Sequence, residues 1–299
     1  MKLRIGTRKS PLAQAQTQWV VNQLKDKFST LDVEIILITT SGDQALPPST
    51  TGGLKALFTK EIEEALLENR IDMAVHSLKD MAAELPGGLT IGAVPLREDP
   101  RDVWISPHHT PFKSLPKKSK VGTGAVRRQA QLRHLRPDLN LVPMRGNVDT
   151  RLRKLQEEEL DGIILALAGL RRLGKEKSVT EVLSTDVMLP AVGQGALAIE
   201  IREKSDQLLP YISALDHPAS HIAVLAERAL LKALGGNCQT PIAAYAQVHR
   251  DQITLNALVV SPDGKSIFRN EATDHLKEAE TLGQALAKTL LVAGADKIL

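Results

Sequence analysis

The chain has 299 residues, of which 42% are hydrophobic and 24% are charged, and its 38 Lys and Arg nearly balance its 35 Asp and Glu. This composition is typical of a globular protein with two or three domains and excludes the disordered class. Only 3% of the residues are aromatic, which disfavours a base-stacking nucleic-acid binder. No apolar run approaches the roughly 18 residues of a membrane span.

The cysteine content and the N-terminus bear on the compartment. One cysteine permits no internal disulfide, and the opening stretch MKLRIGTRKS predicts a strand rather than the apolar core of a signal peptide. We therefore expect a cytoplasmic protein, or a protein of an organelle if a transit peptide has been removed, with no nucleic-acid or membrane partner. Nothing in the sequence demands more than a monomer.

Strands and helices alternate in the first part of the chain. We expect strands at residues 3–6, 33–39 and 72–76, and helices at 11–27 and 60–69. Ser10 followed by Pro11 is a good helix start, because the Ser hydroxyl caps free backbone amides and Pro fits the first turn. Residues 40–59 are rich in Gly, Pro and hydroxyl side chains, which predicts a mobile loop or lid.

A second alternating series follows a proline-flanked stretch at residues 95–101, which is typical of a hinge between lobes. Its strands are expected at 103–106, 120–122, 141–144 and 162–166. Residues 189–202 contain a Gly-Gln-Gly turn and an apolar strand, which predict a return to the first lobe. The alternation as a whole predicts a doubly wound sheet in each lobe.

The pattern changes near residue 217 and predicts a small α+β domain. Its elements are expected to be a helix at 219–234, strands at 242–248, 253–260 and 266–269, and a helix at 276–291. The predicted domains are then residues 1–95 with 194–214, residues 101–190, and residues 217–299.

Three strand-to-helix junctions share one design, at residues 6–10, 122–128 and 145–151. In each, a small hydroxyl or amide residue is expected to cap the helix, and Gly lets the backbone approach a ligand. Free amides at a helix start attract anions, and guanidinium groups bind carboxylates with two parallel hydrogen bonds. The guanidinium groups belong to Arg8, Arg127, Arg128, Arg145 and Arg151. Three such junctions predict a ligand with several carboxylates; phosphate is the competitor, but no nucleotide-binding glycine motif is present.

Basic residues are concentrated between residues 127 and 154, where eight Lys or Arg accompany two Asp. Such a local excess in a nearly neutral chain indicates an anionic ligand. The alternative, a solvated helix face, is favoured for four of the eight, namely Arg133, Arg136, Arg153 and Lys154.

Two further motifs carry reactive groups. Lys79 and Asp80 follow a buried strand, where a carboxyl group and an amine facing a cleft can bind a carboxylate and move a proton; a surface ion pair is an equally good interpretation of these residues alone. Cys238 lies in a Gly-rich loop before Pro241. A lone cysteine is most often a small core side chain, but this setting favours an exposed thiol that acts as a nucleophile or an attachment point. The histidines form no metal-ligand spacing, so no metal site is expected.

Taken in order, these motifs resemble those of the porphobilinogen deaminase family over nearly the whole chain. The matching stretches include RIGTRKSPLA, LFTKEIEEALLENR, AVHSLKD, LREDPRDVWIS, VGTGAVRRQAQL, MRGNVDTRL, ILALAGLRRLG, LPAVGQGALAIEIR and GGNCQTPIAAYA. The resemblance implies an α/β fold with two doubly wound lobes like those of a periplasmic binding protein, plus a smaller α+β C-terminal domain.

The resemblance also implies a chemistry. It implies a hydroxymethylbilane synthase, a transferase of tetrapyrrole and haem biosynthesis that condenses four porphobilinogen molecules onto a dipyrromethane cofactor and releases a linear tetrapyrrole by hydrolysis. By resemblance, Cys238 holds the cofactor through a thioether, and Asp80 is the catalytic carboxyl group that protonates the leaving amine.

The remaining site residues also follow from the resemblance. Cofactor carboxylates are implied to bind Lys79, Thr123, Arg127, Arg128 and Arg151, with Asp80 facing the pyrrole nitrogens. Incoming substrate and the growing chain are implied to bind Arg8, Ser10, Arg145, Arg172, Gly169 and Gln194. Lys55 and Phe58 fall at the end of the implied lid.

The chain departs from the family pattern at several positions. Where members commonly read G-T-S-S-L-R-R, Gly124 and Ala125 replace two serines, so we expect adjusted affinity and retained activity because the backbone amides still donate. Asp149 replaces a usual Gly, and its charge would repel a nearby carboxylate. Asn237 replaces a usual Gly beside the cysteine, where Asn tolerates a left-handed backbone. A second lysine often found shortly before Lys55 is absent.

One alternative comes from another functional class. A two-lobed binding protein for a carboxylate ligand would share the fold of the first two lobes and lack catalysis. It would need neither the carboxyl group of Asp80 nor the thiol of Cys238, and export would normally require a signal peptide.

Overall fold

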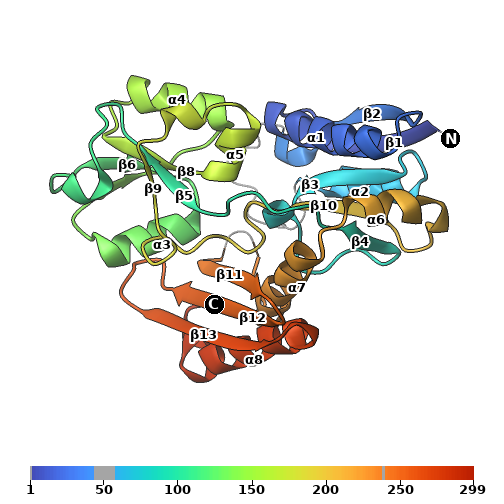
Figure 1. Cartoon of the computed structure of the whole chain (residues 1–299). Coiled ribbons are helices and arrows are strands. Elements are labelled where there is room, and N and C mark those ends of the chain that lie inside the picture. Colours follow the sequence, from blue (N-terminus) through green and yellow to red (C-terminus); the bar gives the residue numbers. More distant parts are fainter. Residues whose placement is uncertain (1, 44–57, 238–239) are drawn as a thin grey trace. The chain divides into compact units, whose positions relative to one another are not determined.

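The computed structural model describes residues 2–43, 58–237 and 240–299, and the chain forms two compact units (Figure 1). Unit 1 is Met1–Arg97 with Ala196–His221, and unit 2 is Glu98–Gly195 with Ile222–Leu299. In the described part of the chain, the strands form two sheets of five strands and one of three. The α/β class with a smaller sheet-rich C-terminal part is confirmed; the division into three domains stays a prediction.

The sheet of unit 1 has the strand order β2-β1-β3-β10-β4. Its strands are β1 (Lys2–Arg8), β2 (Asp32–Ile38), β3 (Met73–Ser77), β4 (Leu89–Ala93) and β10 (Leu197–Arg202). β1 pairs in parallel with β2 and β3, whereas β10 runs antiparallel to β3 and β4. The predicted return of the chain to the first sheet is confirmed by β10. β4, a short strand of sequence LTIGA, was not predicted.

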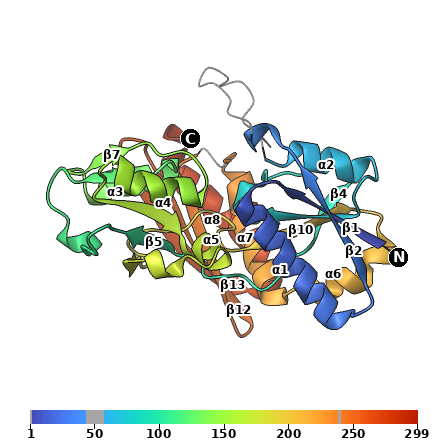
Figure 2. The ribbon, with the colours of Figure 1, turned by 90° about the horizontal axis from the view of Figure 1, so that it is seen from above.

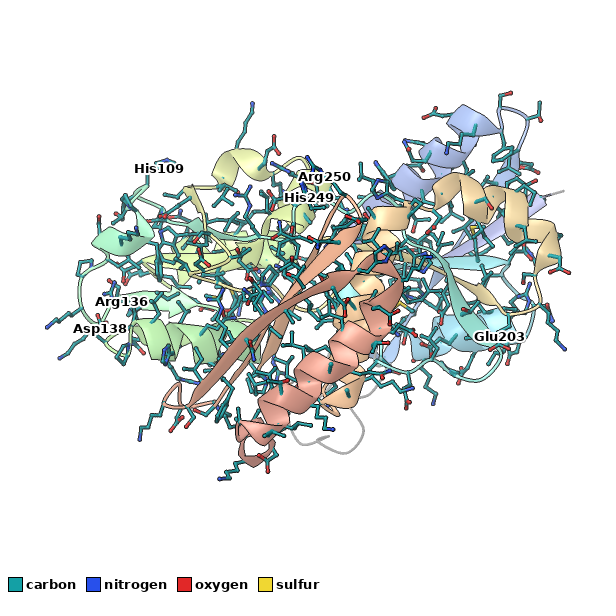
Figure 3. The ribbon with its side chains drawn as sticks, turned by 60° about the horizontal axis from the view of Figure 1, so that its bottom comes forward. His109, Arg136, Asp138, Glu203, His249 and Arg250 are labelled. Carbon is teal, nitrogen blue, oxygen red and sulfur yellow. The ribbon has the colours of Figure 1, made fainter. Side chains whose placement is uncertain are left out.

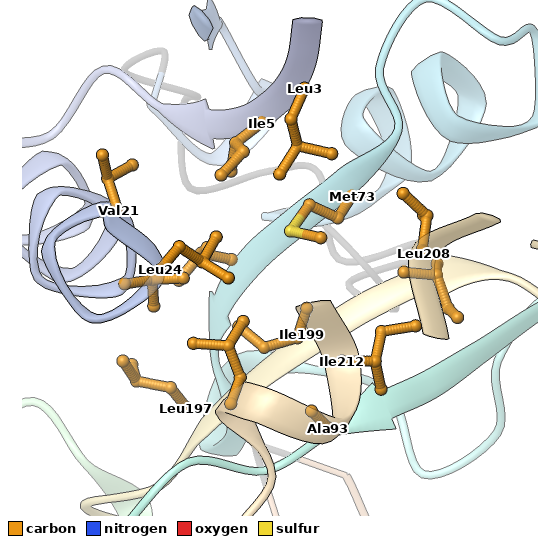
Figure 4. Close-up of a cluster of buried hydrophobic side chains, with 14 of the residues drawn as sticks. Leu3, Ile5, Val21, Leu24, Met73, Ala93, Leu197, Ile199, Leu208 and Ile212 are labelled. Atoms are coloured by element: carbon orange, nitrogen blue, oxygen red, sulfur yellow. The ribbon is translucent and has the colours of Figure 1, made fainter. Parts of the chain in front are cut away.

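Helices cover both faces of this sheet, with α1 (Pro11–Lys27) and α2 (Lys60–Leu67) on opposite sides of β1 (Figure 2). α1 and α6 (Leu209–Leu215) bury their apolar side chains against one face, where Leu3, Leu24 and Ile199 are completely buried (Figure 4). α2 packs on the other face through Ile62 and Leu66. Because successive side chains of a strand point to opposite faces of the sheet, each strand contributes apolar side chains to the cores on both faces.

The sheet of unit 2 has the order β7-β6-β8-β5-β9, which repeats the pattern of the first sheet. Its elements are β5 (Asp102–Ile105), β6 (Lys120–Gly122), α3 (Val126–Leu135), β7 (Asn140–Val142), α4 (Val148–Glu157), β8 (Gly162–Ala166), α5 (Leu167–Arg172) and β9 (Glu181–Val182). β6 is parallel to β7 and β8, and β5 is antiparallel to β8 and β9. α3 packs on one face around Trp104, and α4 and α5 pack on the other around Ile163.

The C-terminal part contains an antiparallel sheet in the order β11-β12-β13. Its elements are α7 (Pro218–Ala233), β11 (Ile242–His249), β12 (Gln252–Val260), β13 (Ile267–His275) and α8 (Ala279–Val292). β13 runs six residues past the predicted end at 269, paired with β12 throughout, because cross-strand pairing continues where its outward side chains are polar. Among the described residues, no helix is both long and apolar enough to cross a membrane.

An ion pair joins the first strand of unit 1 to the start of its third strand. The Arg4 guanidinium donates to Asp72 from Nε at 3.1 Å and from Nη2 at 2.7 Å, and its backbone amide donates at 2.9 Å. Burial alone would raise the pKa of Asp72, but these hydrogen bonds lower it below the usual 3.8. The carboxylate therefore stabilises the folded state above about pH 4, and this contribution is lost as the pH falls through the lowered pKa.

We expect Asp72→Asn to lower the free energy of unfolding by about 1–2 kcal/mol at pH 7, because charged hydrogen bonds are lost at a partly exposed pair. The difference from the native chain should shrink below about pH 4, where Asp72 becomes protonated in the native chain as well. Urea denaturation at several pH values measures both effects, with the exposed Asp206→Asn as control. A pH-independent difference would contradict the assignment.

Candidate active site

Functional side chains of unit 1 meet at one edge of its sheet. Arg8 ends β1 and Ser77 ends the neighbouring parallel strand β3, so both lie at the carboxyl edge where α/β proteins bind ligands. Asp80 follows in a single 3-10 turn, Leu78–Asp80. A pocket at this edge is lined by Arg8, Ser10, Phe58, Ser77 and Asp80, together with α1 and β3 side chains. The structure thus brings four of the sequence-predicted residues together.

The walls of this pocket are held by local contacts. The Arg8 guanidinium carbon lies 4.2 Å from the centre of the Phe58 ring, a cation–π arrangement. Ser10 caps α1, its hydroxyl accepting from the Ala13 amide at 3.3 Å. Gln16 of α1 hydrogen-bonds the Ser77 hydroxyl at 2.8 Å. Lys55 and residues 44–57 of the predicted lid lie outside the described residues.

A buried polar cluster lies behind the pocket. His76, which lines the pocket, places Nε2 3.0 Å from Oε2 of Glu200 on β10, and both side chains are buried. Glu63 of α2 is buried beside them. Burial raises the pKa of Glu63; the Glu200 carboxylate adds to this, and the Thr59 hydroxyl and His76 oppose it. Perturbed acids of this kind gather at functional sites.

Unit 2 holds a second cluster around one buried carboxylate. Asp102, the first residue of β5, accepts from Arg127 Nη1 at 2.7 Å and from Arg128 Nη2 at 2.8 Å. Gln194 Nε2 donates to the same carboxylate at 2.8 Å and to the Pro100 carbonyl at 2.6 Å. Burial alone would raise the pKa of Asp102, but the two guanidinium groups hold it far below its usual range.

The β6–α3 and β7–α4 junctions lie against each other. The Thr123 amide donates to the Val142 carbonyl at 3.0 Å, and a Cβ added at Gly124 would lie 2.1 Å from the Met144 carbonyl oxygen. The Thr123 hydroxyl is buried and has no hydrogen-bond partner among the described residues. Arg145 is exposed and makes no hydrogen bond or ion pair within the described part of the chain.

The predicted helix caps are confirmed at two of the three junctions. Asn147 caps α4, accepting from the Thr150 amide at 2.8 Å, as Ser10 caps α1. The expectation is wrong at α3: its N-cap is Ala125, and the helix start has no side-chain hydrogen bond there. Thr123 lies too early in the turn to serve.

At the start of α4, Asp149 replaces the usual glycine of the family pattern, and a neighbouring residue neutralises its charge. Asp149 forms an ion pair with Lys175 at 2.6 Å, which neutralises the charge that replaces the family's glycine. Arg151 donates from Nε to the Gly146 carbonyl at 2.8 Å.

Arg172, another arginine that the resemblance assigned to the site, ends α5 and is half-buried. Its Nη2 donates to the Gly195 carbonyl at 2.7 Å. Burial lowers the pKa of Arg172 to about 10, with Glu98 opposing. Gly169 lies one turn earlier on the same helix and is half-buried.

Two models of one protein family match the chain. "Porphobilinogen deaminase, dipyromethane cofactor binding domain" matches residues 3–210, and "Porphobilinogen deaminase, C-terminal domain" matches residues 221–292. The chain belongs to the porphobilinogen deaminase family.

Curated relatives agree. The porphobilinogen deaminase of Syntrophotalea carbinolica is 50% identical over 99% of this chain and 95% of its own length. That of Carboxydothermus hydrogenoformans is 47% identical, also over 99% of this chain and 95% of its own length. Among solved structures, the methionine-binding protein MetQ aligns with a TM-score of 0.45 and 14% identity over 72% of this chain and 89% of that protein; this likeness supports no argument.

The family's cysteine motif falls at Cys238, which lies outside the described residues. The described residues that flank it in the sequence are hydrogen-bonded to each other. The Asn237 amide donates to the Thr240 hydroxyl at 3.0 Å, and that hydroxyl donates to the Asn237 carbonyl at 2.6 Å. Lys79 is half-buried beside Asp80 in the chain and does not line the pocket. Its role stays a prediction.

The arginines interpreted as a solvated face make contacts at the surface, and one of them contacts a segment far away in the sequence. Arg136 pairs with Asp138 at 2.7 Å, both labelled in Figure 3, and Arg153 pairs with Glu157 at 2.8 Å. Arg133 donates to the Pro262 carbonyl at 2.6 Å.

Sequence reasoning missed Asp102, His76 and Glu200. Each is a polar residue in an otherwise apolar strand. This pattern could have indicated a functional or paired residue, because a charge in a buried strand needs a partner. The partners themselves come from segments far away in the sequence, so the pattern alone did not identify them.

The close approach at Gly124 predicts that restoring the family's first serine is harmful in this chain. A side chain there meets backbone, so we expect Gly124→Ser to cost about 1–3 kcal/mol of stability. Ala125→Ser is the matched control: it supplies the missing cap of α3 and should add about 1 kcal/mol. Thermal and urea unfolding measure both. Equal stability of Gly124→Ser and the native chain would contradict the geometry.

Proposed function

We propose that this chain condenses four porphobilinogen molecules, with loss of ammonia, onto a dipyrromethane cofactor and then releases the linear tetrapyrrole hydroxymethylbilane by hydrolysis. The observation that carries the proposal is that the Asp80 carboxyl group shares one pocket with the guanidinium of Arg8 and the hydroxyl of Ser10. Porphobilinogen carries two carboxylates and a leaving amine, so its reaction needs both anion-binding groups and a proton donor.

In the proposed reaction Asp80 moves the protons. Its carboxyl group donates a proton to the amino nitrogen of porphobilinogen, the carbon–nitrogen bond breaks, and ammonia leaves. The carboxylate that remains stabilises the positive charge on the substrate pyrrole. When the new carbon–carbon bond forms, the proton displaced from carbon returns to this carboxylate, which restores the acid for the next cycle.

We assign the carboxylates of the substrate and the growing chain to the cations and polar groups at the strand ends. Arg8 and Ser10 supply them in unit 1. In unit 2 the exposed guanidinium of Arg145 and the half-buried one of Arg172 serve the same purpose. Gly169, Gln194 and Phe58 also belong to the binding residues in this proposal, and Lys55 is assigned to them by its motif alone.

The residues around the β6–α3 turn fit a cofactor with carboxylates. Arg127 and Arg128 bring two buried positive charges against the single charge of Asp102, and the buried Thr123 hydroxyl has no partner within the described chain. These three residues, with Lys79 and Arg151, would hold the carboxylates of dipyrromethane, and Cys238 would hold it through a thioether. When bound, the cofactor supplies the free pyrrole carbon to which the first substrate is joined.

We further infer a monomer located in the cytoplasm. Thioether formation at Cys238 requires a reduced thiol, and the cytoplasm keeps isolated thiols reduced.

The cofactor assignment predicts a definite mass. The purified chain should be heavier than its sequence by two pyrrole units, and Cys238→Ala should lack this addition, because the thioether sulfur is gone. Intact-mass spectrometry measures the addition, and acidic Ehrlich's aldehyde reagent should colour it. A stable, unmodified native chain would instead favour a binding protein without catalysis.

The proton-transfer assignment predicts that Asp80→Asn folds normally and loses turnover by about a hundredfold or more, since general acid–base groups contribute factors of about 10² to 10⁴. Ammonia release from porphobilinogen measures turnover, and circular dichroism measures folding. Asp26→Asn, an exposed substitution on α1, is the control. Native activity of Asp80→Asn would remove Asp80 from the mechanism.

A further inference from the structure

The carboxylate of Asp102 connects three segments of unit 2 that are distant in the sequence. It begins β5, it accepts from the first turn of α3 through Arg127 and Arg128, and it accepts from Gln194 in the turn before β10. Asp102 is completely buried, and both arginines are nearly so. The guanidinium groups are fixed further by the Leu189 and Ile164 carbonyls, at 2.6 Å and 3.0 Å.

The charges in this cluster do not cancel. Two guanidinium groups face one carboxylate, so one positive charge is left over in a buried position. Burial and repulsion from Arg128 lower the pKa of Arg127, although Asp102 opposes them. An uncompensated buried charge is costly unless an anion completes the site.

A second, independent feature at the same turn also calls for a ligand. Thr123, four residues before Arg127, is 1% exposed, and its hydroxyl makes no hydrogen bond within the described part of the chain. Buried hydroxyl groups are normally paired, so an unpaired one in the same β6–α3 turn as an excess positive charge marks a place for an acceptor that carries negative charge.

We propose that Asp102 is a positioning residue that holds Arg127 and Arg128 in place and cancels one of their two charges, so that the β6–α3 turn binds one carboxylate of the ligand. This rests on the proposed function, in which the ligand is dipyrromethane. The fixed guanidinium groups need no reorientation when the ligand arrives, and the surplus of one charge matches one carboxylate.

The proposal can be tested by comparing four chains that differ in the net charge of this cluster. The cluster carries one net positive charge in the native chain, two in Asp102→Asn, none in Arg127→Gln, and one again in the double variant. Each apoprotein is produced in cells that cannot make porphobilinogen. It is then supplied with limiting hydroxymethylbilane, the linear tetrapyrrole from which we propose that the apoprotein assembles its own cofactor. The initial rate of cofactor loading is followed by intact mass, and the stability of each apoprotein by thermal unfolding.

We expect loading to follow net charge. Arg127→Gln should load about tenfold or more slowly, because a charged hydrogen-bonding site is lost, yet unfold near the native temperature because its remaining pair is balanced. Asp102→Asn should unfold at a lower temperature, and the double variant should regain much of both stability and loading. Asp138→Asn, which breaks the half-buried pair with Arg136 just after the end of α3, is the control and should load normally (Figure 3).

Three results would overturn the proposal: native loading by Arg127→Gln, a folded double variant that loads no faster than Arg127→Gln, or an Asp102→Asn chain with native stability and loading. If Asp102→Asn does not fold, Arg127→Gln and the double variant still decide. Absence of any pyrrole mass from the native chain would instead refute the proposed function.

Discussion

Burial of positive charge is the constraint on which the second unit depends. Arg127 and Arg128 enter the protein interior at the start of α3, and water cannot solvate them there. Their ion pairs with Asp102 offset the desolvation cost and at the same time fix the positions of β5 and α3. The motifs GAVRR, DPRDVWIS and AVGQG, which are separated in the sequence, are therefore parts of one hydrogen-bonded structure.

The two five-stranded sheets place their functional residues in the same way. In each order the second strand, β1 or β6, has parallel neighbours on both sides, and the fourth strand, β10 or β5, runs antiparallel to its neighbours. Turns at the carboxyl ends of the parallel strands then carry Arg8 in one sheet and Thr123 and Arg145 in the other. Helix starts at these turns leave backbone amides for anions, so a polycarboxylate ligand suits both.

Where the chain departs from the family pattern, neighbouring residues compensate for the changed charge or occupy the changed space. Lys175 neutralises Asp149, and Gly124 permits the close approach of the Met144 carbonyl, which a serine would obstruct. The α3 helix begins without a side-chain cap, and the buried ion pairs of its first turn hold it instead. At this junction the helix start is therefore held by ion pairs with a distant residue and not by a capping side chain.

The sequence by itself determined the local elements and the family. Apolar periodicity and capping residues located α1 at Pro11–Lys27 and β6 at Lys120–Gly122, because these signals act over a few residues. The sequence did not predict β4, whose five residues are too few to show a clear alternation of apolar and polar side chains. It also did not predict the end of β13, where only pairing with β12 extends the strand.

The tertiary structure alone decided which charges meet. Asp102 is paired with arginines 25 and 26 residues away, His76 faces Glu200 on the neighbouring strand, and Arg8 lies beside Phe58. Sequence motifs named most of the cationic residues but neither their counter-ions nor their burial. Electrostatic partners are selected by distance in the folded chain, and that distance follows from strand order and register rather than from spacing along the sequence.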